Sequence, residues 1–189
     1  MAKVAANTLR KGMVVEYNSK LWVVVENELR SPGKGAAVAQ VIMRDIQSGT
    51  KMDIRFATQD MVERARVDEE DYQYLYSDGN HYTFMHTETF DQVIVDKELI
   101  GEPAVFLQEN MVCVLQTNEG KPLSVRLPET VTMMISEADP VVKGQTASSS
   151  YKPAVLENGA RVLVPPHIEA GTRIVVRTED SSYVERAKD

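Results

Sequence analysis

The chain has 189 residues, of which 43% are apolar and 26% charged, and it carries a formal net charge of −7. This size suits one ordinary domain or two to three very small ones, and it excludes a large multidomain enzyme. No apolar run approaches the roughly 18 residues of a membrane span. The N-terminal segment lacks the apolar run and small-residue cleavage site of a signal peptide, so we expect a cytoplasmic protein and no membrane partner.

Residue types that often carry chemistry are sparse. A single cysteine, Cys113, excludes an internal disulfide, and the three histidines have no metal-binding spacing. The four successive carboxylates of residues 68–71 are typical of a solvated face rather than of a cation site. Since no Ser/His/Asp or Cys/His set is recognisable, the sequence predicts a binding protein without a catalytic apparatus, a metal or a cofactor.

Charge is distributed unevenly along the chain. Residues 1–64 hold ten Lys/Arg against seven Asp/Glu, residues 65–128 hold four against twelve, and residues 129–189 hold seven against nine. An acidic middle behind a basic N-terminal segment indicates that only part of the surface faces a polyanion.

Short apolar runs bounded by turn residues predict β-hairpins in the first segment. Runs at 13–17 and 21–29 flank the turn Asn18-Ser19-Lys20, and runs at 37–46 and 51–57 flank a second turn. These four strands predict a small curled sheet.

The remaining two segments continue in the same way, with one change of period. Runs at 72–78 and 81–86 flank a strong turn, Asp78-Gly79-Asn80. Residues 87–101 predict a short helix that begins at Thr87 or Thr89 and ends at Gly101, before a strand within 105–117. Further strands are expected within 131–138, 154–165 and 172–187.

Three segments of about sixty residues, each with four to six short strands, predict an all-β fold of three small β-barrel domains in tandem. The expected boundaries are 1–64, 65–128 and 129–189, with junctions at the change of charge near Arg64 and at Pro128. A single β-sandwich is the alternative.

The most distinctive local pattern is SPGKGAA at 31–37, between two predicted strands. Pro32 fixes φ near −65°, Gly33 accepts a positive φ, and Gly35 leaves a second bare backbone position, which predicts a tight turn that presents Lys34. The spacing of a nucleotide-binding P-loop is absent. The alternative interpretation is a plain hairpin turn with a solvated lysine.

Four motifs together resemble the bacterial elongation factor P family over essentially the whole chain. They are PGKG at 32–35, YLYSDG with FMHTETFDQ at 74–92, KGQTASSSYKPA at 143–154, and NGARVLVPPHIEAG through SYVERA at 158–187. The resemblance implies an N-terminal KOW/SH3-like barrel, two OB-fold barrels and an elongated, tRNA-like outline.

The resemblance further implies a monomeric translation elongation factor that is not an enzyme. Such a factor binds the 70S ribosome between the peptidyl and exit sites, contacts the peptidyl-site tRNA and relieves stalling at consecutive prolines. In this view Lys34 reaches toward the acceptor end of the tRNA and holds it in a reactive geometry.

In the family the loop-tip residue is extended covalently by a partner enzyme. Lys34 excludes the branch of the family that carries arginine at this position. The resemblance implies a lysine-modifying enzyme as a partner, and modification of Lys34 depends on that enzyme rather than on this sequence.

The third segment departs from the family at one position. Many members have Gly-Asp-Thr in the loop said to approach the exit-site mRNA codon, whereas this chain has Gly144-Gln145-Thr146, which puts the codon contact of the aspartate in doubt. Charge and family position together mark further candidate RNA-contacting residues: Lys143, Lys152, Arg161, Tyr183 and Arg186.

Two other functions remain open from the residues alone. Barrels of this kind suit an RNA-binding module in transcription or RNA metabolism equally well, because a fold does not determine a function. The acidic middle segment suits a protein-interaction chain.

Overall fold

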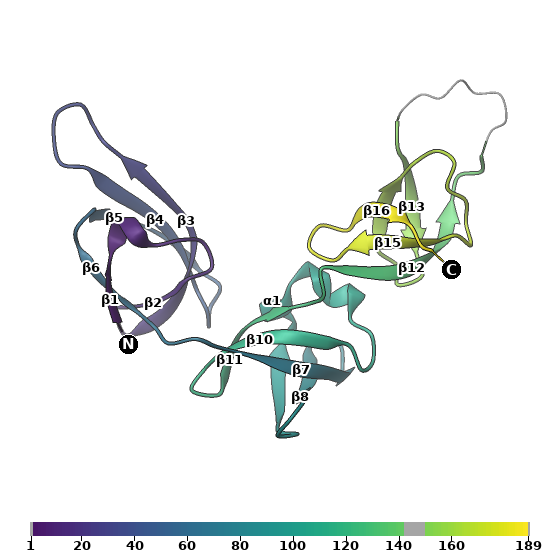
Figure 1. Cartoon of the computed structure of the whole chain (residues 1–189), viewed down its shortest axis with the longest axis horizontal. Coiled ribbons are helices and arrows are strands. Elements are labelled where there is room, and N and C mark those ends of the chain that lie inside the picture. Colours follow the sequence, from purple (N-terminus) through teal and green to yellow (C-terminus); the bar gives the residue numbers. More distant parts are fainter. Residues whose placement is uncertain (1, 142–149, 189) are drawn as a thin grey trace. The chain divides into compact units, whose positions relative to one another are not determined.

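The computed structural model describes residues 2–141 and 150–188, and most of their secondary structure is β-strand (Figure 1). The strands form three separate sheets, of six, five and five strands, rather than one sandwich. Each sheet curls on itself in the manner of a small barrel (Figure 1). The predicted all-β class with three small barrels is therefore confirmed.

The first sheet is antiparallel in the order β1-β6-β2-β3-β4-β5. Its strands are β1 (Ala2–Ala5), β2 (Val14–Tyr17), β3 (Lys20–Arg30), β4 (Val38–Asp45), β5 (Lys51–Ala57) and β6 (Met61–Arg64), with a 3-10 turn η1 (Ala6–Thr8) after β1. The two predicted hairpins are thus confirmed. Alternate side chains of β3 and β4 fill the core, which includes Trp22, Val24, Ala39, Val41 and Met43.

The second sheet has the order β11-β10-β7-β8-β9. Its strands are β7 (Asp68–Ser77), β8 (His81–His86), β9 (Gln92–Asp96), β10 (Val112–Asn118) and β11 (Lys121–Arg126). The helix α1 (Lys97–Ile100) and the 3-10 turn η2 (Glu102–Phe106) connect β9 to β10. Phe84 and Phe106 are fully buried in its core.

The helix predicted for 87–101 is mostly wrong. It ends at Gly101 as expected, but only residues 97–100 are helical, and Gln92–Asp96 form a strand paired with β8. Val95 is buried there while Gln92, Ile94 and Asp96 are exposed, which is the two-residue alternation of a strand. Cross-strand pairing therefore outweighed the helix-start pattern of Thr87 and Thr89.

The third sheet has the order β14-β13-β12-β15-β16. Its strands are β12 (Thr130–Ala138), β13 (Lys152–Leu156), β14 (Arg161–Val164), β15 (Arg173–Arg177) and β16 (Ser182–Arg186). The two outermost strands, β14 and β16, also contact each other, so this sheet closes toward a barrel. Its core includes Ile135, Leu156, Val164, Ile174 and Val176.

The described chain divides into two compact units. One contains residues 1–70 together with 116–124, and the other contains residues 71–115 together with 125–189. The second unit includes a buried cluster to which both the second and third sheets contribute, for example through Phe84 and Ile174. The boundaries at 64 and 128, and the elongated outline, stay predictions. Among the described helices, none is long and apolar enough to cross a membrane.

Candidate functional site

The loop that joins β3 to β4 places Lys34 at its centre. The last cross-strand pair of the hairpin is Arg30 with Val38, so the loop comprises the seven residues 31–37 and is longer than the tight turn that the sequence predicted. Residues 31–36 are all exposed. In Figure 1 this loop extends beyond the curled part of the first sheet. Three residues therefore separate Lys34 from each strand, and its side chain is exposed to solvent.

The two loop glycines have different roles from those predicted. Gly35 has φ +132°, a conformation that side chains with a Cβ rarely adopt, whereas Gly33 does not lie in the positive-φ region. The expectation that Gly33 supplies the positive φ is therefore wrong. Among the described atoms, a Cβ on Gly35 would meet only Pro32 Cγ, at an ordinary 3.8 Å, so the backbone angle rather than lack of space requires the glycine.

Several side-chain hydrogen bonds lie on one face of the β3–β4 hairpin, next to the loop. Arg30 donates to the Glu28 carboxylate at 2.9 Å, and this hydrogen bond raises the pKa of the Arg30 guanidinium. Gln40 donates to Asp53 across β4 and β5 at 2.8 Å. Lys34, in contrast, makes no hydrogen bond or ion pair with any described residue. Its ammonium group is available to an external anion.

Asn27 attaches the hairpin to the rest of the barrel. Its side-chain amide donates to the carbonyl oxygens of Ala6 at 2.9 Å and Leu9 at 3.1 Å, just after the register shift between Val24 and Glu26. These bonds satisfy two carbonyls at the η1 turn. No local sequence signal marks this role, because the shift that turns Asn27 toward the core depends on strand pairing.

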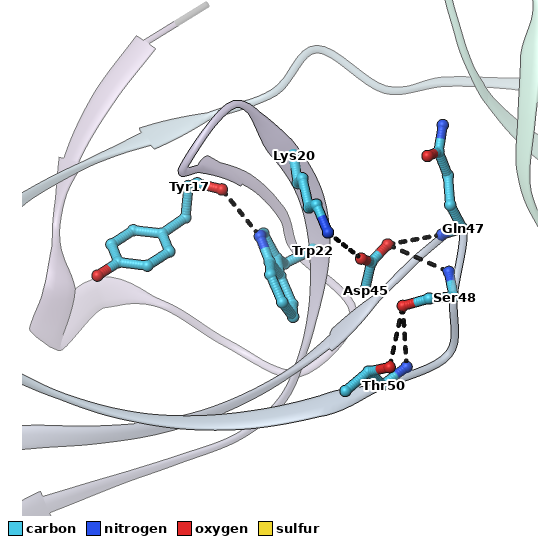
Figure 2. A network of polar contacts seen from close by, with 7 residues as sticks. All are labelled: Tyr17, Lys20, Trp22, Asp45, Gln47, Ser48 and Thr50. Carbon is cyan, nitrogen blue, oxygen red and sulfur yellow. Dashed lines mark hydrogen bonds and ion pairs between the residues drawn. The ribbon is translucent and has the colours of Figure 1, made fainter.

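The other end of β4 is held by Asp45 (Figure 2). Its side chain is almost fully buried. It accepts hydrogen bonds from the backbone N–H groups of Gln47 at 2.8 Å and Ser48 at 3.3 Å, and it pairs with Lys20 at 3.4 Å. The bond from Gln47 contributes most to lowering the pKa of Asp45, although burial acts in the opposite direction. Asp45 thus fixes the β4–β5 turn.

The structure describes only some of the candidate RNA-contacting residues of the third segment. Lys143, Gly144, Gln145 and Thr146 lie outside the described residues. Lys152 donates to the backbone carbonyl of Asp139. Arg161 and Arg186 are exposed and make no ion pair within the described chain, whereas Tyr183 packs edge-on against Tyr151 with 6.4 Å between ring centroids. Whether any of these four residues contacts RNA stays a prediction.

No catalytic constellation emerges in the described part of the chain. Burial raises the pKa of the Cys113 thiol to about 12, so this cysteine is not a thiolate nucleophile at neutral pH. His86 is buried and accepts backbone hydrogen bonds through Nδ1 from Glu88 and Thr89, both at 3.1 Å. No group of His, Cys, Asp and Glu residues among residues 2–141 and 150–188 is arranged to hold a metal ion.

In the described residues, three small curled sheets and a long hairpin that presents an exposed lysine define a protein of the small-barrel class. Three family models match the chain in order: the elongation factor P KOW-like domain at residues 5–62, its OB domain at 67–125 and its C-terminal domain at 131–186. The chain belongs to the elongation factor P family, and it is a translation elongation factor. This is a family of translation factors rather than of enzymes.

Curated relatives match over nearly their full length. Elongation factor P of Rhodospirillum centenum is 59% identical over 99% of this chain and 100% of its own, and that of Xanthobacter autotrophicus is 54% identical over 100% of both chains. Among solved structures, a translation initiation factor 5A from Methanococcus jannaschii is 23% identical, with a TM-score of 0.49 over 66% of this chain and 95% of its own.

Proposed function

We propose that this protein binds the 70S ribosome between the peptidyl and exit sites, contacts the peptidyl-site tRNA and stimulates peptide-bond formation at consecutive prolines. Membership of the elongation factor P family favours this function over a general RNA-binding module in transcription or RNA metabolism. The observation that carries the proposal is the position of Lys34, unpaired within the described chain and central in an exposed seven-residue loop.

The proposed mechanism is positional. Proline is a poor nucleophile and a conformationally constrained donor, so its peptidyl-tRNA reacts slowly unless it is held in a productive geometry. The Lys34 ammonium binds the phosphates at the acceptor end of the tRNA while the hairpin fixes where that charge stands. Relieving a stall about a hundredfold requires only about 2.7 kcal/mol. Orientation can supply up to roughly 7–11 kcal/mol in ideal cases, so no catalytic group is needed.

Covalent extension of Lys34 by a modifying enzyme belongs to the same proposal. An exposed side chain between small residues is accessible to such an enzyme, and a longer polar group reaches further toward the acceptor end. Intact mass spectrometry of the protein from its native host, followed by peptide mapping, tests this point. An excess mass located at Lys34 supports it, and an unmodified native peptide removes this part alone.

The third segment of the chain contributes RNA contacts in this proposal, including an approach of Gly144, Gln145 and Thr146 to the exit-site mRNA codon. Exposed Arg161 and Arg186 provide the electrostatic attraction to RNA phosphate. In this proposal the chain acts as a monomer in the cytoplasm. Removing one cation from a phosphate should reduce the salt slope of ribosome binding by about one unit or less. Neutralising Arg161 and Arg186 together should therefore flatten that slope, whereas neutralising the acidic residues Glu69 and Glu70 should not.

A proline-run reporter in cells that lack their own factor tests the central claim. Lys34→Ala should abolish rescue, while the matched control Lys11→Ala, another exposed lysine of the first sheet's unit, should rescue like the wild type. Both variants should retain the wild-type Tm, because an exposed lysine contributes little stability. Full rescue by Lys34→Ala would refute the role of the loop.

A further inference from the structure

One edge of the second sheet is unusually open. Among the described residues β9 pairs only with β8, and it is the last strand in the order β11-β10-β7-β8-β9. The backbone N–H of Lys97 donates to the carbonyl oxygen of Asn80, and the backbone N–H of His86 donates to the carbonyl oxygen of Asp91. By the alternation of antiparallel ladders, the intervening Val93 and Val95 bond to β8, so the backbone groups of Gln92, Ile94 and Asp96 point away from the sheet.

The middle of this edge carries an exposed apolar side chain. Ile94 is 66% exposed, and it lies in register with Thr83 of β8 and Tyr76 of β7, of which Tyr76 is 62% exposed. Thr83, between these two larger side chains, is only 6% exposed. The three residues therefore form a short row on one face of the sheet, and its two ends are open to solvent.

Two other edge strands, β11 and β5, carry protection that β9 lacks. Exposed edges are normally blocked by lysine, proline or a row of charges, because they otherwise recruit further strands. The opposite edge strand, β11, begins Lys121-Pro122, and β5 alternates Lys51, Asp53 and Arg55 on its exposed face. In β9, Gln-Val-Ile-Val-Asp, the only charge is the terminal aspartate.

The turn that enters β9 presents an aromatic residue in an unfavourable conformation. Phe90 is 66% exposed and has φ +63°, which is strained for a bulky side chain. The turn is nevertheless firmly built: Nδ1 of His86 accepts from Glu88 and Thr89, and the N–H of Phe90 donates to the carbonyl of His86 at 3.0 Å. A phenylalanine that is neither buried nor relaxed in the free protein is suited to contact something else.

We propose that the β9 edge, with Phe90 as its apolar anchor, binds an extended basic segment of a ribosomal protein as an additional strand. Pairing through the backbone of an open edge is an established mode of peptide recognition. The exposed carboxylates around it, from Glu88, Asp91, Asp96 and Glu98, select lysine and arginine in the added strand and disfavour RNA phosphate. This partner rests on the proposed function, since it assumes that the protein binds ribosomes.

Binding of purified 70S ribosomes, measured by co-sedimentation, tests the strand addition. Ile94→Pro removes an outward N–H without removing a bond to β8, and it should weaken binding about tenfold. The matched control Ile94→Thr keeps the N–H and the β propensity, and it should bind within about twofold of the wild type. Should Ile94→Pro fail to fold, the double reversal Glu88→Lys with Glu98→Lys tests the same edge and should weaken binding to a similar degree.

Phe90→Gly separates a binding role from a structural one. Glycine relieves the positive φ, so the Tm should be unchanged or higher, while ribosome binding should weaken about tenfold. A photo-crosslinking amino acid at position 94 should cross-link to a Lys/Arg-rich segment of a ribosomal protein. Wild-type binding by Ile94→Pro, by Phe90→Gly and by the Glu88→Lys/Glu98→Lys double variant, or cross-links to rRNA alone, would overturn the inference and leave the proposed function standing. If the wild-type protein does not sediment with ribosomes, both are wrong.

Discussion

The two ends of strand β4 differ in their side-chain contacts, and local sequence does not predict this difference. At one end, residues 31–36 are exposed, and none of them makes a side-chain hydrogen bond or ion pair with another described residue. At the other end, Asp45 gathers two backbone N–H groups and Lys20, while Ser48 and Thr50 bond to each other at 3.1 Å (Figure 2). Both segments contain the glycine and small polar residues that mark a turn.

The contrast shows that the turn at one end of β4 holds the strand in place, while the loop at the other end presents the lysine. A rigid turn at the Asp45 end fixes the register of β4 and β5, and the shared β4 carries that register to the last pair before the loop, Arg30 with Val38. The loop itself has few internal contacts, so its lysine keeps its hydrogen-bonding capacity for an external anion. Changes at the two ends should therefore affect different measurements.

The largest expected effect is a complete separation of proline-run rescue from the Tm when the two ends of β4 are changed one at a time. Lys34→Ala should abolish proline-run rescue with an unchanged Tm, whereas Asp45→Ala should lower the Tm by about 2–6 °C and keep rescue at a permissive temperature, because it leaves two turn N–H groups without an acceptor. Thermal unfolding and the reporter together give the comparison. Loss of rescue by Asp45→Ala at a temperature where it is fully folded would show that the two ends are not independent.

The next-largest effect is expected from a change of backbone conformation inside the loop. Gly35→Ala forces a Cβ onto φ +132° and should cost about 1–3 kcal/mol or redirect the loop, so rescue should fall several-fold. Gly33→Ala is the matched control, because Gly33 has no positive φ and no neighbour within 4 Å of an added Cβ. Equal effects of the two substitutions would contradict the assignment of the strained position to Gly35.

The Asp45 turn should also depend on pH. Because the pKa of Asp45 is lowered in the folded protein, its carboxylate stabilises the fold above the unfolded-state pKa of about 3.9, and that contribution is lost as the pH falls through the folded-state pKa. The Tm difference between the wild type and Asp45→Asn should therefore be greatest near pH 7 and shrink below about pH 4. A difference that stays constant from pH 7 to pH 3 would rule out the ionised carboxylate as its source.

The smallest effect concerns a like-charge pair beside this turn. Arg44 and Lys51 stand directly opposite each other on β4 and β5, both exposed, and neither has an ion-pair partner within the described chain. Like charges in this position are destabilising. Lys51→Glu should stabilise the protein by about 0.5–1 kcal/mol in low salt, less in high salt, with Lys51→Gln intermediate. Destabilisation by Lys51→Glu in chemical denaturation would show that the two side chains do not interact.

Several elements could be predicted from local sequence because local chemistry decides them. The hairpins of the first sheet lie where their turn residues and β-branched runs placed them, and Lys34 occupies an exposed loop as SPGKGAA indicated. The family resemblance was likewise carried by short motifs. None of these conclusions requires knowledge of which strand pairs with which.

The errors occurred where distant residues decide the outcome. A helix-start pattern at Thr87 and Thr89 was overridden because β8 offers Gln92–Asp96 a ladder of backbone hydrogen bonds. The loop glycine with a positive φ is Gly35 rather than Gly33, since the closing pair Arg30–Val38 leaves seven residues to span instead of a tight turn.

The sequence by itself thus determined the β class, the hairpin turns and the lysine that the chain presents, because each depends on the preferences of a few neighbouring residues. Only the tertiary structure decided which polar groups support that lysine. Asn27 faces η1 because of a register shift in β3, and the Asp45 carboxylate is buried beside Lys20 because β3 pairs with β4. The open edge of β9 likewise exists only because the order of the described strands places none of them beside it.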